Sequence, residues 1–136
     1  MERKILCSTE ADSKRVHKML MEYNLRYMHD FEDYNFHIEE NGEIIAGIVA
    51  WCVSDTLEVE YLRVADSHRR EGLGTQLLNH VEKLAREKGF KRIQLNTLSF
   101  QAPEFYLKHG YTKQFESPFF DNYTQIYFIK DLTEEE

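Results

Sequence analysis

One segment in the middle of the chain restricts the fold more than any other. The strand-like run Leu57 to Val64 leads through the loop ADSHRRE into a helical pattern from Gly72 to Lys88. Along that pattern leucine, valine and alanine recur at three- and four-residue steps, and Gly89 stands where a helix C-cap belongs. A strand followed at once by a long amphipathic helix predicts an α/β domain in which helices cover a sheet.

The N-terminal part of the chain predicts a short strand and a second helix. Ile5 to Cys7 is the expected first strand, and Ser8 and Thr9 are suited to a turn or a helix N-cap. A helix is expected from about Asp12 to Tyr27. Its buried stripe is formed by the apolar residues at helical spacing, Val16, Met19, Leu20, Tyr23 and Tyr27.

A hairpin and a C-terminal group of elements complete the expected sheet. The dipeptide Asn41-Gly42 lies between Tyr34–Ile38 and the apolar run Ile44–Val53, the pattern of a two-residue hairpin. The later elements are a strand at Arg92–Thr97, a short helix between Pro103 and Gly110, and strands at Tyr111–Phe115 and Gln125–Lys130. The predicted fold is a mixed, mostly antiparallel central sheet of about seven strands flanked by helices, in the order β-α-ββ-β-α-β-α-ββ.

Length and composition indicate one domain spanning residues 1–136. The chain has the modal domain size, and 42% of its residues are hydrophobic, so it can bury a core without disulfides. Cys7 and Cys52 show no CxxC or Cys/His ligand spacing. We expect two reduced cysteines and no metal site.

Charge and hydropathy limit the function classes. A formal net charge of -7 argues against a nucleic-acid binder and is compatible with a cationic acceptor such as an amine. No signal-peptide pattern and no run long enough to span a bilayer is present in the printed sequence. The expectation is a cytoplasmic protein without a membrane partner.

The loop before the central helix has the geometry of an anion site. It reads Arg69-Arg70-Glu71-Gly72-Leu73-Gly74 and ends at a predicted helix N-terminus. Free backbone N–H groups and the positive end of the helix dipole favour phosphate oxygens there, and glycines let a ligand approach the main chain. On the glycines alone, an ordinary strand-to-helix turn explains the segment equally well.

Arg-x-x-Gly-x-Gly after a strand reading Leu-x-Val resembles the acetyl-CoA signature of the GNAT superfamily of N-acetyltransferases. Neither the Rossmann fingerprint nor the P-loop pattern is present. The resemblance implies main-chain contacts of Leu62 and Val64 with the pantetheine arm. It implies pyrophosphate contacts at Arg69, Arg70, Glu71, Gly72, Leu73, Gly74 and Thr75. Arg70 stands where many members have glycine, and Glu71 where a basic residue is common, so retuned affinity is expected.

A second segment, NTLSFQAPEFYLKHGYTK, resembles the other signature of this superfamily. The matching residues are Ala102, Phe105, Tyr106, Gly110 and Tyr111. Taken alone, Phe105-Tyr106 would indicate core packing. The asparagine frequent in the family is Ser99 here, so that cofactor hydrogen bond is expected from the Ser99 hydroxyl or from Asn96.

The resemblance also implies a mechanism of direct attack. An alkyl amine with a pKa of ~10 must lose a proton before it attacks, and Glu58, or else Glu60 on the same strand face, is the expected base. The backbone N–H of Val64 is expected to stabilise the oxyanion, and Tyr106 to protonate the leaving thiolate. The resemblance places the acceptor walls at about Tyr23–Tyr34 and Ser117–Tyr123. Ordinary loop and core packing explain those segments as well.

The reading that follows is an acetyltransferase that moves an acetyl group from acetyl-CoA to a primary amine, on a small molecule or a peptide. A homodimer is compatible with it. The alternative is a CoA-binding sensor or partner-binding module without turnover. A nucleotide-dependent oxidoreductase is disfavoured by the missing fingerprint.

Overall fold

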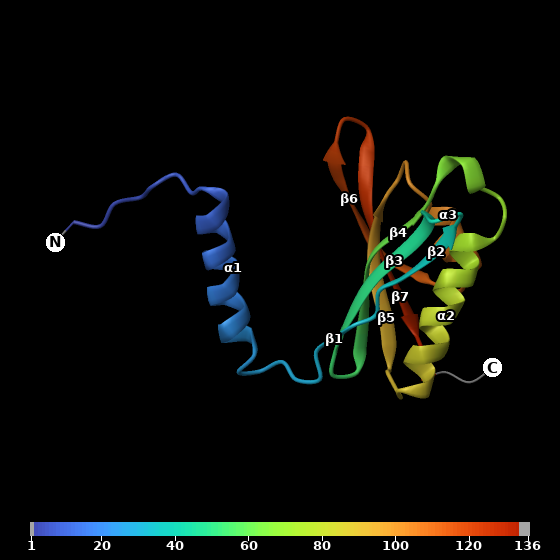
Figure 1. Ribbon diagram of the computed structural model, residues 1–136, viewed down its shortest axis with the longest axis horizontal. Coiled ribbons are helices and arrows are strands. Elements are labelled where there is room, and N and C mark those ends of the chain that lie inside the picture. The colour runs from blue at the N-terminus through green and yellow to red at the C-terminus, as the bar shows by residue number, and fades with distance from the viewer. Residues whose placement is uncertain (1, 134–136) are drawn as a thin grey trace.

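A computed structural model describes residues 2–133, with one mixed sheet, two helices packed on one of its faces and a third helix standing apart (Figure 1). The elements are α1 Glu10–Asn24, β1 Glu32–Asp33, β2 Phe36–Glu40, β3 Glu43–Val53, β4 Thr56–Val64, α2 Leu73–Glu87, β5 Arg92–Leu98, α3 Pro103–Lys108, β6 Thr112–Phe120 and β7 Tyr123–Asp131. The mixed, mostly antiparallel sheet of seven strands confirms the predicted fold class.

The strand order explains where the sheet opens. The strands run β1-β3-β4-β5-β7-β6, with β2 also paired to β3. Every described pair is antiparallel except β4 with β5, because the chain crosses between these two through α2. The one parallel pair is therefore flanked by α2 and its N-terminal loop.

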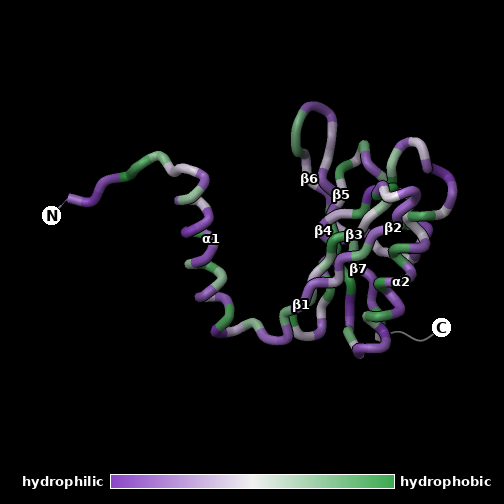
Figure 2. The backbone as a smooth tube through the Cα atoms, in the orientation of Figure 1, coloured by the Kyte–Doolittle hydropathy of each residue, from purple (hydrophilic) through white to green (hydrophobic). Residues whose placement is uncertain are grey.

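The core lies between α2, α3 and one face of the sheet. The stripe of α2 that the sequence predicts is buried, with Leu77, Leu78 and Val81 each at most 4% exposed. They share one apolar cluster with strand residues such as Ile93 and Phe128. Hydrophobic residues accordingly concentrate in the strands and α2, whereas α1 is largely hydrophilic (Figure 2).

The predicted hairpin and the predicted end of the central helix are confirmed. Asn41 and Gly42 join β2 to β3 with φ of 54° and 80°, the left-handed values that a two-residue hairpin turn requires. Gly89 follows α2 with φ of 80°, as expected of a residue that ends a helix. The last two strands are longer than predicted, because β6 runs on to Phe120 and β7 begins at Tyr123.

The predicted strand at Ile5–Cys7 is wrong. Residues 2–9 have no regular structure, and Ile5 and Leu6 are exposed. Three apolar residues without a neighbouring strand cannot satisfy their backbone groups in a sheet. The first strand is instead β1, two residues that pair with Trp51 and Cys52 of β3.

The predicted buried stripe on the first helix is also wrong. Thr9 forms a capping box with Asp12, which confirms the expected cap, and the helix ends at Asn24, three residues before Tyr27. No described residue of α1 is buried, and Met19 is 70% exposed. The helix is held by its own cap and by charged pairs such as Lys14 with Glu10 at 3.6 Å, not by the sheet.

Candidate active site

A cleft opens where β4 and β5 separate. Their parallel pairing covers only Thr56–Val59 on β4 and Arg92–Leu95 on β5. Beyond these residues the two strands diverge, and a cavity of about 660 Å³ lies between them. Ligands of α/β sheets commonly bind at such a point, outside the ends of parallel strands. Val64, the expected oxyanion donor, lies on the separated part of β4 and lines this cleft.

A bulge in β4 changes which side chains face the cleft. The β3–β4 register shifts between Val49 and Ala50, and Glu60 is the extra residue on β4. Leu62 pairs with the buried Ile48, whereas Glu58 pairs with Trp51 on the opposite face. An uninterrupted strand would put Leu62 and Val64 on the same face as Glu58, whereas the structure puts them on the opposite face. Simple alternation fails because one inserted residue reverses the face of every later side chain.

The glycine loop forms one end of the cleft. Gly72 is the N-cap of α2 with φ of 79°, and no side chain caps this helix. A Cβ added at Gly72 would meet no atom within 4 Å apart from those of its chain neighbours, so there is open space beside this helix N-terminus. Arg69 and Arg70 line the cleft beside them. Uncapped N–H groups, the helix dipole and two guanidinium groups suit a pyrophosphate.

Most of the predicted cofactor residues line this cleft together. They are Leu62, Val64, Arg69, Arg70, Gly72, Leu73, Gly74, Thr75, Asn96, Ala102, Phe105 and Tyr106. The carboxylate candidate Glu60 is also in the lining, whereas Glu58, Glu71 and Ser99 are not.

Ser99 has a structural partner instead. Its hydroxyl accepts a hydrogen bond from the N–H of Thr124 at 3.0 Å, and its own N–H donates to the Thr124 carbonyl at 2.8 Å. These two bonds fix the loop after β5 to β7. Asn96 accepts from Gln125 at 3.0 Å through Oδ1 and keeps its amide N–H groups for a ligand. Of the two candidates for the asparagine-type contact, the geometry favours Asn96.

Tyr106 projects from α3 into the buried side of the cleft. The residue is 7% exposed, and its ring lies against Phe105, Tyr111 and Phe128 at centroid distances of 5.2, 5.7 and 5.9 Å. Burial raises the pKa of Tyr106 to about 12. The hydroxyl is therefore protonated at neutral pH and can act as a proton donor.

Glu58 has the electrostatics of a base. Burial raises the pKa of its carboxyl above the ordinary value, a hydrogen bond from Gln94 lowers it in part, and Glu60 raises it further. The Gln94 Nε2 to Glu58 Oε1 distance is 3.0 Å. The raised pKa supports Glu58 as the base, and the position in the cleft wall supports Glu60.

Sequence reasoning missed several residues of the cleft. His68, Phe100 and Gln101 line it. His109, from the end of α3, lies 3.1 Å from the Thr75 hydroxyl and links α3 to the start of α2. No ligand spacing or periodicity marks these positions, since they lie in loops or at helix ends.

The two expected acceptor walls differ in their placement. Phe120 and Tyr123, at the tip of the β6–β7 hairpin, pack against Phe100 at 6.1 and 4.9 Å and so reach the mouth of the cleft. Tyr23 and Tyr27 belong to the N-terminal helical region that stands away from the sheet and are not in the cleft lining.

Comparison with known proteins decides the family. The model of the acetyltransferase (GNAT) family matches residues 4–111. The chain belongs to this family. The resemblance seen in its two sequence signatures is thereby confirmed, and this GNAT chain carries an acetyltransferase domain.

Individual relatives agree with the family. A crystal structure of an acetyltransferase from Bacillus cereus is 31% identical, covers 96% of this chain and 98% of its own, and has a TM-score of 0.78. Blasticidin-S acetyltransferase of Streptomyces morookaense is 40% identical over 73 residues, which cover 53% of this chain and 54% of that protein. The chain therefore spans about half the length of this relative. A GNAT acetyltransferase from Elizabethkingia anophelis with acetyl-CoA bound shares the fold, with 23% identity, coverage of 85% and 83%, and a TM-score of 0.61.

Two negative findings hold for residues 2–133. No helix there has the length and hydropathy to cross a membrane. Within the same range, no three His, Cys, Asp or Glu side chains form a group that could hold a metal ion.

Proposed function

We propose that this chain is a single-domain, acetyl-CoA-dependent N-acetyltransferase that acts on primary amines by direct transfer. The observation that carries the proposal is the cleft at the β4–β5 divergence, which has the uncapped N-terminus of α2 at one end and Tyr106 in its wall. One site thus combines a phosphate-binding element with a proton donor. The reduced Cys7 and Cys52 fit a cytoplasmic location, which belongs to the same proposal.

The residues of the cleft fit acetyl-CoA. The pyrophosphate would lie against the N–H groups that follow Gly72, beside Arg69 and Arg70. The pantetheine arm would extend along the edge of β4 near Leu62 and Val64, which β5 leaves open beyond Val59. Bound acetyl-CoA supplies an activated acyl thioester, and no metal is invoked.

Residues of this chain supply the proton transfers. Glu58, directly or through water and Glu60, would accept the proton of the incoming ammonium group, and its raised pKa brings it closer to the working pH. Tyr106, with its pKa of about 12, would donate a proton to the departing thiolate. The direct route uses no acyl-enzyme, so neither the exposed Cys7 nor the buried Cys52 has a catalytic part.

The acceptor is proposed as a small amine or a peptide amine. Support comes from the net charge of -7, which attracts cations, and from the family relative that acetylates blasticidin S. The aromatic group Phe100, Phe120 and Tyr123 provides an apolar wall at the cleft mouth.

The test is release of CoA thiol from acetyl-CoA with a panel of polyamines, amino acids, aminoglycosides, blasticidin S and peptides. The proposal expects release that depends on at least one amine, with the acetylated amine found by mass spectrometry. If CoA binds but no amine in the panel is acetylated, the result favours the alternative function, a CoA-binding module without turnover.

A further inference from the structure

The N-terminal helix leaves an apolar stripe without a partner. Val16, Met19, Leu20 and Tyr23 lie on one side of α1, and each is at least 51% exposed. A lone helix of 15 residues is only marginally stable in water, and most helices in proteins are stabilised by packing an apolar face. The stripe therefore indicates a packing surface that the single copy does not use.

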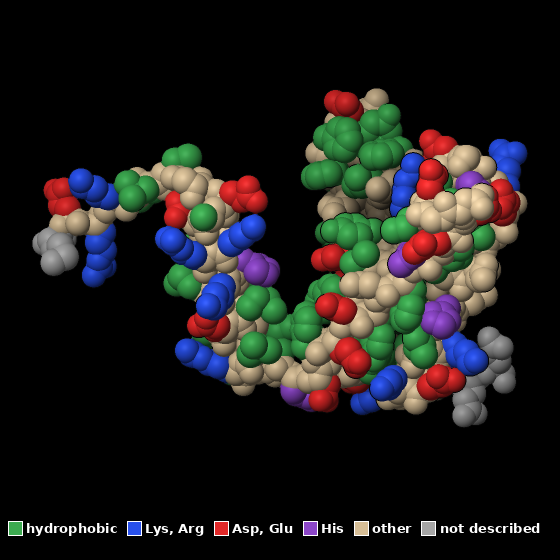
Figure 3. Space-filling model, in the orientation of Figure 1, with side chains coloured by type: hydrophobic (Ala, Val, Ile, Leu, Met, Phe, Trp, Pro, Cys, Tyr) green, Lys and Arg blue, Asp and Glu red, His purple; other side chains and the backbone are tan. Residues whose placement is uncertain are grey.

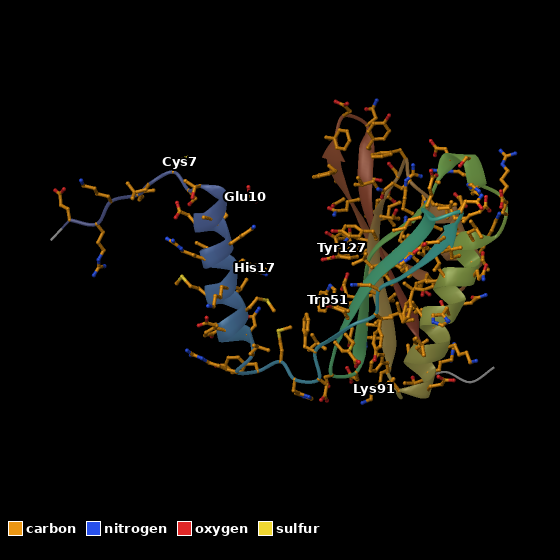
Figure 4. The ribbon with its side chains drawn as sticks, in the orientation of Figure 1. Cys7, Glu10, His17, Trp51, Lys91 and Tyr127 are labelled. Carbon is orange, nitrogen blue, oxygen red and sulfur yellow. The ribbon has the colours of Figure 1, made fainter. Side chains whose placement is uncertain are left out.

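The sheet has an uncovered face of matching character. Trp51 and Tyr127 alternate along their strands with buried residues, so their side chains lie on the face opposite α2. Each is half of a stacked aromatic pair, Phe31 with Trp51 at 5.5 Å and Phe115 with Tyr127 at 4.3 Å. Both residues lie on the side of the sheet toward α1, and His17 lies on the side of α1 toward the sheet (Figure 4). The space-filling view shows a deep hollow between α1 and this face (Figure 3).

The connector opposes packing of α1 on its own sheet. The N–H groups of Leu25, Arg26, Tyr27 and Met28 all donate to carbonyls of the last turn of α1, at 2.8 to 3.1 Å. From His29 the chain is fixed to the end of β3, because the His29 carbonyl accepts from Ser54 at 2.9 Å. These bonds leave only the backbone around Met28 and His29 free to turn α1 toward its own sheet. A second copy can fill the hollow without any change in this connector.

Charge favours a copy of the same chain as the occupant. Residues 1–27 contain six Lys and Arg against four Asp and Glu, whereas residues 28–136 contain eleven against twenty. A weakly basic N-terminal arm therefore suits an acidic domain of the same protein.

We propose that the chain forms a two-fold dimer in which α1 of each copy packs on the uncovered sheet face of the other. Exchange of an identical element between copies makes a closed, self-complementary interface. A helix of 15 residues is about 22 Å long and about 10 Å wide. The two helix faces and two sheet patches together bury on the order of 1,000 Å², the lower bound for a specific interface, before residues 2–9 contribute.

The dimer also deepens the proposed function, on which this one consequence rests. Glu58 pairs with Trp51 across β3 and β4, so it lies on the face that the exchanged helix covers. The acceptor side of the active site would then be completed by the second copy. The CoA side needs no residue of the second copy, because the described lining of the cleft comes from residues 59–106 of one chain.

Two methionines on α1 provide a matched test. Met19 belongs to the stripe, and Met21, about 200° further around the helix, lies on the opposite side. Sedimentation equilibrium at micromolar concentration should give a dimer for the parent and for Met21→Asp. Met19→Asp should dissociate at least 10-fold more readily, and Phe115→Glu should repeat this result from the sheet side.

Fluorescence of Trp51, the one tryptophan of the chain, reports where α1 lies. Its quenching by acrylamide should be weak in the dimer and strong in the Met19→Asp monomer. A concentration-independent monomer, whether Trp51 is shielded by its own α1 or open, would overturn the proposal. So would a dimer that both Met19→Asp and Phe115→Glu leave intact. Unchanged CoA affinity of the monomeric variants shows that they fold and separates this outcome from any failure of the enzyme assignment.

Discussion

The side-chain amide of Gln94 donates a 3.0 Å hydrogen bond to the carboxylate of Glu58, across the parallel strands just before they diverge. This bond partly offsets the burial that raises the pKa of Glu58, and the negative charge of Glu60 acts in the opposite direction. The pKa of the proposed base thus depends on one neighbour on each strand, Glu60 on β4 and Gln94 on β5.

Changes to these two neighbours should move the acid limb of the pH–rate profile in opposite directions. A base works in its ionised form, so the rate falls as pH drops through the pKa of Glu58. Gln94→Leu removes a contact that lowers this pKa and should shift the limb to higher pH. Glu60→Gln removes a like charge and should shift it to lower pH. Profiles of kcat/KM that do not separate in this way would assign proton removal to another group.

Glu58→Gln should show a rate loss that depends on pH. The variant cannot accept the proton, but an amine with a pKa of ~10 deprotonates by itself as pH rises. The loss relative to the parent should therefore shrink between neutral and alkaline pH. A constant deficit across that range would point to a structural part for Glu58.

Gly72→Asp should abolish the thermal stabilisation by CoA, because a carboxylate would stand where the phosphate oxygens approach the N-terminus of α2. Gly72→Asn is the matched control, since both side chains tolerate the left-handed φ of 79° and differ mainly in charge. Asn should retain more of the CoA-dependent shift in melting temperature than Asp. Equal, undiminished shifts in both variants would make the loop a turn and nothing more.

Arg70 adopts φ of 69°, which explains why a glycine suits this position. Arg70→Gly relieves that strain and Arg70→Ala does not, while both remove the same charge. We expect Arg70→Gly to unfold at a higher temperature than Arg70→Ala. Relief of the strain raises its free energy of unfolding by about 1 kcal/mol, and the entropy that glycine adds to the unfolded chain offsets part of this gain. Their CoA affinities should fall equally. A more stable alanine variant would contradict the strain argument.

Tyr111→Phe should destabilise the fold. Its hydroxyl donates at 2.7 Å to Glu82, which is 8% exposed and also accepts from Lys130 at 3.0 Å. Loss of a buried hydrogen bond to a charged group costs about 1.5–3 kcal/mol. Tyr127→Phe, on the uncovered sheet face, serves as control. Denaturant titration should give Tyr111→Phe a free energy of unfolding well below that of both the parent and Tyr127→Phe.

Much of the sheet could be predicted from the sequence, because local rules govern it, whereas the residues that line the cleft were predicted through the resemblance to the GNAT signatures. Asn41-Gly42 specifies a hairpin and Gly72 a helix start, whatever the rest of the chain does. The bulge at Glu60 could not be predicted, since the pattern LEVEYLRV also fits an uninterrupted strand. The exposure of Met19 was equally hidden, because helical periodicity shows that a face is apolar and not what covers it.

Tyr106→Phe tests the central claim most directly, in a steady-state acetyl-transfer assay paired with a CoA titration. The change keeps the ring that packs against Phe105, Tyr111 and Phe128, and among the residues that the structure describes the hydroxyl has no hydrogen-bond partner to lose. CoA affinity and stability should stay near those of the parent, while kcat falls by roughly 10²-fold or more. Full activity with normal CoA binding would contradict the account, since the cleft would then lack its proposed acid.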